Sequence, residues 1–340
     1  MKTLASILSL CATLAACGGG GGGSPSVNSD SKSVALSAQN YGAAATEVMA
    51  SSAIVSANAV STAMFTGADV QTALPFTHFV QSNLTQLIKN WRTSPTQLVG
   101  AVTTESIPCS RGTLTIAYND LLGNDVPDAG DKIAISANNC LLEGSNLNGE
   151  ITISFNRYTE IGYSDYEAFV TATSSQFVSE TNGVTTGSNG SFDMTLSSKM
   201  MPNSNGFIQP QTDLKINIAS MTYNITSAGS TKVYEYKNYV LHNSTYNNQV
   251  SQSVTGSINI PTLGSNTATI QTIKNFVSPT TSSAASRLPY PTDGIALVTF
   301  KQGGTIRATA NGTSSALVEL DQDGDGKFET SKPVPWSDIL

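Results

Sequence analysis

The chain has 340 residues, of which 39% are hydrophobic and only 12% are charged. Aspartate and glutamate number 24 against 17 lysines and arginines, so the formal net charge at pH 7 is −7. The basic residues are scattered singly and form no positive stripe, which argues against a nucleic-acid-binding protein.

The N-terminal residues have the pattern of a bacterial export signal. An apolar run at 4–14 follows a single lysine and is too short to span a bilayer. It leads into Leu-Ala-Ala-Cys at 14–17, which resembles a bacterial lipobox at all four positions. This resemblance implies that residues 1–16 are a signal peptide and that Cys17 carries acyl chains such as palmitate. The alternative is an ordinary secretory signal that happens to contain a cysteine.

Six consecutive glycines follow at 18–23, and residues 17–33 are predicted to be a lipidated cysteine with a flexible tether. Gly18, rather than aspartate, directly follows Cys17. By resemblance to the sorting rule of Gram-negative lipoproteins, this favours the outer membrane, with either leaflet open. The expected membrane contact is made by the acyl chains, because no other apolar run is long enough for a transmembrane helix.

Residues 34–95 are predicted to be helical, in two segments. Residues 34–66 are rich in alanine and lack proline, and Gly67 is expected to end the first helix. Pro95 is expected to end the second. Apolar residues recur at helical spacing, namely Tyr41, Ala45, Val48, Val55 and Ala59 in the first segment and Val80, Leu84, Leu87, Ile88 and Trp91 in the second. Both stripes are interpreted as faces that pack on a core.

In the remainder of the chain, at 96–340, apolar and polar residues alternate in short segments. Clusters of glycine, asparagine, aspartate and serine separate these segments. Such alternation buries one face and is typical of an antiparallel sheet. A glycine followed by two alternating apolar residues recurs, and we interpret each such glycine as the start of a strand: Gly112, Gly149, Gly190, Gly256 and Gly304.

The predicted fold class is therefore α+β, dominated by one long antiparallel β-sheet. The irregular spacing of the glycines excludes a strict solenoid or propeller and favours a meander, either an open sheet or a partly closed barrel. An open sheet of this size leaves an apolar face, and the N-terminal helices are expected to pack on its concave side. The sequence gives no domain boundary within 96–340.

Cys109 and Cys140 are predicted to form a disulfide. Cys11 leaves with the signal peptide and Cys17 takes the lipid, so these two cysteines remain as a pair in an oxidising compartment. Metal ligation and a catalytic thiol are the alternatives. Both are disfavoured because the chain has no Cys-x-x-Cys motif and only two histidines.

The sequence at 321–329 matches the first half of an EF-hand-type calcium loop. It places carboxylates at positions 1, 3 and 5, and a glycine at position 6, where a positive φ is needed. The candidate calcium ligands are Asp321, Asp323, Asp325, the carbonyl of Lys327, and Glu329. Lys332 stands where such a loop has a bidentate glutamate, and both flanks have the pattern of strands. The alternative is an acidic β-hairpin turn that binds no ion.

A second acidic loop lies between the two paired cysteines. Asp120, Asn124, Asp128 and Asp131 fall at positions 1, 5, 9 and 12 of the same frame, but Leu122 occupies position 3. A solvated hairpin loop is the favoured interpretation, and metal binding is the alternative.

Three features together resemble uncharacterised proteobacterial outer-membrane lipoproteins. They are the lipobox with its glycine tether, the acidic hairpin between Cys109 and Cys140, and the C-terminal Asp-x-Asp-Gly-Asp-Gly hairpin before Trp336. The resemblance covers only these segments, and it implies no known activity.

Tyrosines and asparagines are concentrated between residues 223 and 248. Tyr234 and Tyr236 are predicted to project from the same face of a strand. Exposed tyrosines with neighbouring amides can stack on and hydrogen-bond to sugar rings, so these two residues are candidate ligand-binding residues. The alternative is ordinary cross-strand pairing within the sheet.

No catalytic motif nominates an enzyme. The chain has no Gly-x-Ser-x-Gly elbow, no His-Glu-x-x-His and no P-loop, and His78 and His242 are far apart in the sequence. The expected function is that of a cell-envelope lipoprotein with a non-catalytic binding or structural role, with an envelope protein, lipid or glycan as partner. Two alternatives are a carrier that holds a lipophilic ligand in a curved sheet under a helical lid, and a glycan-binding surface protein.

Overall fold

A computed structural model describes residues 33–55, 75–93, 100, 102–142, 144–160, 165–203, 206–264, 266–279 and 290–336. The predicted signal peptide, Cys17 and the six glycines of the predicted tether lie outside the described residues, as do Gly67 and Pro95, the predicted helix ends. Among the described helices, none combines the length and apolar character needed to span a membrane.

The helices are α1 (Tyr41–Val55), α3 (Phe76–Thr93) and the short 3-10 helix η1 (Pro261–Leu263). The strands are β1 (Val102–Ile107), β2 (Thr113–Asn119), β3 (Lys132–Leu142), β4 (Ser145–Glu160), β5 (Tyr166–Thr181), β6 (Val184–Pro202), β7 (Ile208–Ser227), β8 (Ser230–Tyr246), β9 (Gln249–Ile260), β10 (Asn266–Pro279), β11 (Asp293–Phe300), β12 (Thr305–Ala310), β13 (Ser315–Asp321) and β14 (Thr330–Pro335).

All 14 strands belong to one sheet, in which each strand pairs antiparallel with its neighbours in the sequence. β1 pairs only with β2 and β14 only with β13, so the sheet is open and does not close into a barrel. The predicted α+β class and antiparallel meander are confirmed. Of the two predicted forms, an open sheet or a partly closed barrel, the structure has the open sheet. From Ser33 onward the chain forms one compact unit, so the helices and the sheet share a core.

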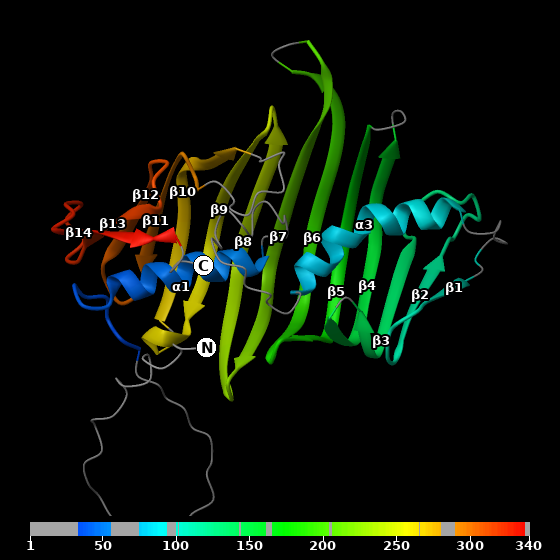
Figure 1. Ribbon diagram of the computed structural model, residues 1–340, viewed down its shortest axis with the longest axis horizontal. Coiled ribbons are helices and arrows are strands. Elements are labelled where there is room, and N and C mark those ends of the chain that lie inside the picture. Colours follow the sequence, from blue (N-terminus) through cyan, green and yellow to red (C-terminus); the bar gives the residue numbers. More distant parts are fainter. Residues whose placement is uncertain are drawn as a thin grey trace, which may run out of the picture. The chain divides into compact units, whose positions relative to one another are not determined.

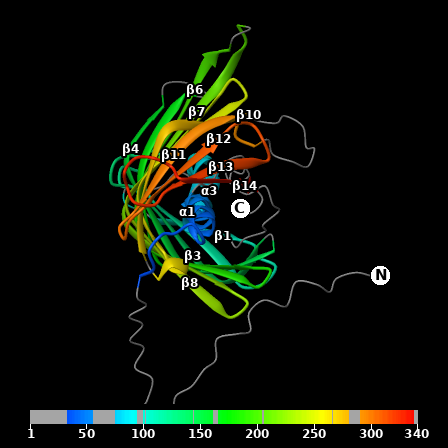
Figure 2. The same ribbon diagram turned by 90° about the vertical axis from the view of Figure 1, so that its left-hand side faces the viewer.

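Both helices lie on the same, concave face of the sheet (Figures 1 and 2). The strands alternate between buried and exposed residues along most of their length, and the buried residues face the helices. α1 contacts β9 and the β12–β14 end of the sheet, whereas α3 contacts β5. The predicted placement of the helices is therefore confirmed.

Aromatic side chains fix α3 to the sheet. Phe76 packs edge-on against Phe192 of β6, with ring centroids 5.0 Å apart. At the other end of the helix, Trp91 packs edge-on against Tyr118 of β2 and Phe155 of β4, at 5.5 and 5.7 Å. α3 thus spans several strands, and its predicted apolar face is the buried face.

Only two of the five recurring glycines precede strands, so part of that interpretation is wrong. Gly112 and Gly304 come directly before β2 and β12, but Gly149, Gly190 and Gly256 lie inside strands at shifts of register. At Gly256, which has a φ of 144°, an added Cβ would lie 2.5 Å from the Cα of Tyr239 on β8. Glycine is needed there because a bulge brings two backbones together, and such bulges bend the sheet.

Candidate functional site

The turn between β13 and β14 holds the acidic loop at 321–329. Asp321 ends β13, and its side chain is turned inward, with only 4% of the residue exposed. One of its carboxylate oxygens accepts the N–H of Gly324 at 2.7 Å and the other accepts that of Gly326 at 3.0 Å. Both glycines have a positive φ, so the backbone winds tightly around this carboxylate.

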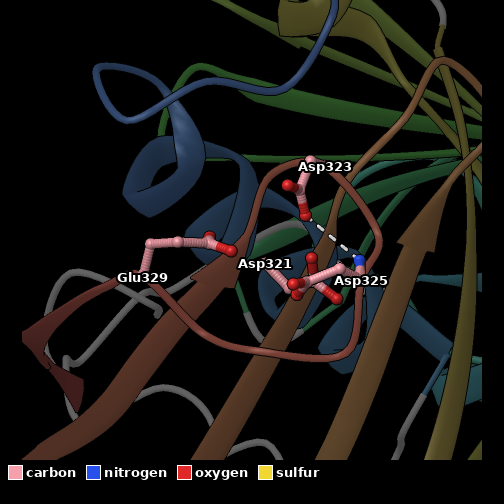
Figure 3. A group of neighbouring side chains, drawn as sticks. All are labelled: Asp321, Asp323, Asp325 and Glu329. Carbon is pink, nitrogen blue, oxygen red and sulfur yellow. Dashed lines mark hydrogen bonds between the residues drawn. The ribbon is translucent and has the colours of Figure 1, made fainter.

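Four carboxylates converge in this loop (Figure 3). Asp321, Asp323, Asp325 and Glu329 each place one oxygen so that the four oxygens lie within 4.8 Å of one another. Glu329 closes the loop, because its carboxylate accepts the N–H of Gln322 at 3.1 Å. Clustered carboxylate oxygens are the donors that Ca²⁺ prefers, and this cluster could hold a metal ion.

Two lysines distinguish this loop from a full calcium loop: one competes with a cation, and the other stands where the full loop has a glutamate ligand. The ammonium of Lys327 lies 3.1 Å from a carboxylate oxygen of Asp325, so it competes with a cation there. Lys332 takes no part in the cluster, because its ammonium lies over the ring of Tyr41, 4.8 Å from the centroid. Without a bidentate carboxylate, water would have to complete the coordination, which places the expected affinity in the weak extracellular range.

The second acidic loop has a structural role for its carboxylates. Asp120 is fully buried and accepts the backbone N–H groups of Leu122, Gly123 and Asp125, at 3.0, 2.6 and 2.9 Å. Asp131 is also buried and accepts two more. Burial raises the pKa of Asp131 above its ordinary value. In both loops the carboxylates accept backbone amides, but among the described residues only the 321–329 loop brings three or more histidine, cysteine, aspartate or glutamate side chains close enough to hold a metal ion.

The prediction of a sugar-binding surface at Tyr234 and Tyr236 is wrong. The two rings do project from one face of β8, but that face lies beneath α1. The hydroxyl of Tyr236 donates to the carbonyl of Ser51 at 2.7 Å, and that of Tyr234 donates to the carboxylate of Glu47 at 3.1 Å. Burial raises the pKa of both tyrosines. Neither ring is available to stack on a sugar, so these two tyrosines do not support the alternative of a glycan-binding surface protein.

Glu47 is a buried residue that the sequence did not single out. From α1, one of its oxygens accepts Lys232 at 3.0 Å as well as Tyr234, and the other accepts the N–H of Thr262 at 3.2 Å and its hydroxyl. This carboxylate ties α1 to β8 and η1. The sequence signal is a single acid within an alanine-rich segment, which the apolar stripe does not predict to be buried.

The remaining predicted residues fall in separate places. Cys109 and Cys140 form the predicted disulfide, which joins the segment before β2 to β3. His242 pairs with Asp213 at 2.9 Å on the exposed face of the sheet, whereas His78 lies on α3. The β13–β14 loop therefore has the best-defined site geometry.

No protein-family model, curated protein or solved structure matches this chain.

Proposed function

We propose that this chain is an outer-membrane lipoprotein of the cell envelope whose β domain binds calcium and has no catalytic role. The lipobox pattern at 14–17 supports the lipid anchor, and the cysteine pair supports an oxidising compartment. The observation that carries calcium binding is the convergence of four carboxylates in a loop with the Asp-x-Asp-x-Asp-Gly pattern. A bound ion would offset the repulsion among them and hold the C-terminal hairpin in place.

Calcium is expected to raise the melting temperature of the purified chain. Starting from chelator-treated protein, calcium at tenfold over its dissociation constant would add about 1.4 kcal/mol to the free energy of unfolding. That corresponds to a rise of about 2–4 °C, measured by circular dichroism at millimolar CaCl2. The double variant Asp323→Asn, Asp325→Asn is expected to show no rise.

The matched control changes two acids in the second loop, Asp125→Asn and Asp128→Asn, and is expected to keep the full calcium response. Lys327→Gln is expected to tighten binding, because it removes the ammonium that competes at Asp325. An unchanged melting temperature for the wild-type chain across the millimolar range would refute calcium binding.

A second candidate role, carriage of a lipophile beneath the helices, is favoured by polar groups on the concave face. Asn243 on β8 is 1% exposed, and neither its Oδ1 nor its Nδ2 hydrogen-bonds to a described residue. Ser278 lies on the same face two strands away, offset from Asn243 by two residues along the strands, and its buried hydroxyl also bonds to none of them. Because unpaired buried polar groups are costly, these atoms suit the ester or amide end of an otherwise apolar ligand.

For this second role, mass spectrometry of a solvent extract of the purified chain is expected to detect about one lipophile per chain, as in a single-ligand carrier. Asn243→Leu is expected to reduce that amount, whereas Asn156→Leu on the exposed face of β4 is expected to leave it unchanged. An extract without lipophile from folded wild-type protein would count against the carrier.

A further inference from the structure

The hairpin formed by β6 and β7 extends beyond its neighbours (Figure 1). The two strands pair with each other as far as Pro202 and Ile208. β5 stops pairing with β6 at Ser198, and β8 stops pairing with β7 at Thr212. The end of the hairpin therefore projects from the edge of the sheet, without a strand on either side.

This projecting end carries a cluster of exposed apolar side chains. Phe207 and Ile208 are 71% and 68% exposed, the highest values among the large hydrophobic residues that the structure describes, and Met200 and Met201 are each 39% exposed. Single exposed apolar residues are ordinary, but four on one hairpin end form a patch of the kind that marks an interaction site. We call these four residues the hairpin tip.

The two strand ends that carry the hairpin tip contain no acidic residue. Between residues 199 and 211 the sequence has no aspartate or glutamate, although acids outnumber bases in the whole chain. Lys199 is the only charged residue in this stretch, and it lies just behind the tip. One acid from outside the stretch, Asp165, also lies there and accepts the N–H of Met200 at 2.8 Å. A lysine behind an apolar end is positioned to reach anionic lipid headgroups while the apolar residues enter the acyl region.

An aromatic residue reaches from β8 to the base of the hairpin tip. The hydroxyl of Tyr246, at the end of β8, donates to the carbonyl of Pro202 at 2.6 Å. Pro202 pairs with Ile208, so the tyrosine hydroxyl reaches the level of Ile208 while Lys199 lies three residues behind it, and Phe207 lies beyond both. A lysine and a tyrosine hydroxyl behind an exposed apolar end agree with the layering of residues at a membrane interface. The projecting shape of the hairpin end also favours a lipid contact. A protein partner would need a pocket to surround such an end, whereas lipid chains can close around it.

We propose that the hairpin tip inserts into a lipid bilayer, with Lys199 and Tyr246 at headgroup level. The chain enters the folded unit at the other end of the strands, where the N–H of Val34 donates to the carbonyl of Leu263 at 2.9 Å. The 12 residues of β9 separate the two ends by about 40 Å. The tip therefore lies at the end of the sheet opposite the point where the chain enters the folded unit.

A tryptophan placed at the tip would test this proposal. Phe207→Trp in the full chain is mixed with phosphatidylethanolamine–phosphatidylglycerol vesicles, with or without brominated acyl chains. Brominated lipid is expected to quench its fluorescence by about half after subtraction of the wild-type signal, because bromine quenches indoles within the acyl region. Background is limited, since the chain's own two tryptophans, Trp91 and Trp336, are buried.

The matched control is Val233→Trp, which places the reporter on an exposed residue of β8 near the opposite end of the strands. It is expected to show no quenching, even if an N-terminal anchor holds the chain on the vesicle. Adding Met200→Asp and Ile208→Asp to the Phe207→Trp reporter is expected to abolish quenching. Adding Val102→Asp and Ile273→Asp, two exposed apolar positions elsewhere, is expected to leave it unchanged.

Absence of quenching in a Phe207→Trp chain that melts like the wild type would overturn the proposal. A blue shift of its emission that depends on protein concentration, without vesicles and without quenching by brominated lipid, would also overturn it. That result would assign the tip to a contact between two copies of the chain.

Discussion

Replacing Trp91 with alanine is expected to lower the free energy of unfolding by about 3–5 kcal/mol. Trp91 is fully buried, and its ring packs edge-on against Tyr118 and Phe155, which lie on β2 and β4. Truncation leaves a large cavity between the C-terminal end of α3 and the sheet, and it removes two aromatic contacts. Urea unfolding followed by circular dichroism gives the midpoint and the slope.

The control for this prediction is Gln86→Ala on the exposed face of α3, which is expected to change stability by less than about 0.5 kcal/mol. If Trp91→Ala and Gln86→Ala have equal effects, α3 is not docked on the sheet as described. A fall in the urea slope for Trp91→Ala would indicate instead that the helix detaches before the sheet unfolds.

The helices were predictable because their information is local. The residues Val80, Leu84 and Trp91 recur at helical spacing, and all three are buried in the structure. Glu47 was not predictable in this way, because the groups that satisfy its carboxylate come from β8 and η1, more than 180 residues away. A periodic pattern identifies which residues share a face, but it does not identify the distant partners of a buried acid.

The same limit explains the error at Tyr234 and Tyr236. Alternation placed both rings on one face of a strand, which is correct. Whether that face meets solvent or a helix depends on where α1 packs, and no pattern within β8 carries that information. The misassignment of the bulge glycines to strand starts has a similar cause. Gly256 is needed because Tyr239 of the neighbouring strand approaches it closely, and the sequence around Gly256 does not show this approach.

The candidate calcium loop could be predicted because all its carboxylates lie within nine residues of sequence. Asp321, Asp323 and Asp325 alternate before Gly326, and this spacing alone makes a tightly wound loop bring the oxygens together. The hairpin tip is the opposite case. Phe207 and Ile208 resemble ordinary strand residues in sequence, and their exposure follows from where β5 and β8 stop pairing.

Removing the disulfide with Cys109→Ala and Cys140→Ala is expected to lower the free energy of unfolding by about 3–4 kcal/mol. The bond joins residues 31 apart in sequence, and without it the unfolded chain gains the conformations that the closed loop excluded. Cys140 is also fully buried beside the β3–β4 pairing, so the alanines lose some packing as well. Urea unfolding measures the difference, and treatment of the wild type with a reductant should reproduce most of it.

The loop that the disulfide closes contains Asp120 and Asp131, whose carboxylates hold five backbone N–H groups between them. Because neither cysteine takes part in these hydrogen bonds, we expect the double alanine variant to fold at moderate temperature and to lose stability rather than structure. An unfolded variant would mean that the loop depends on the covalent link. A variant as stable as the wild type would mean that the reduced chain already keeps this loop closed, and that the cysteines add nothing to its stability.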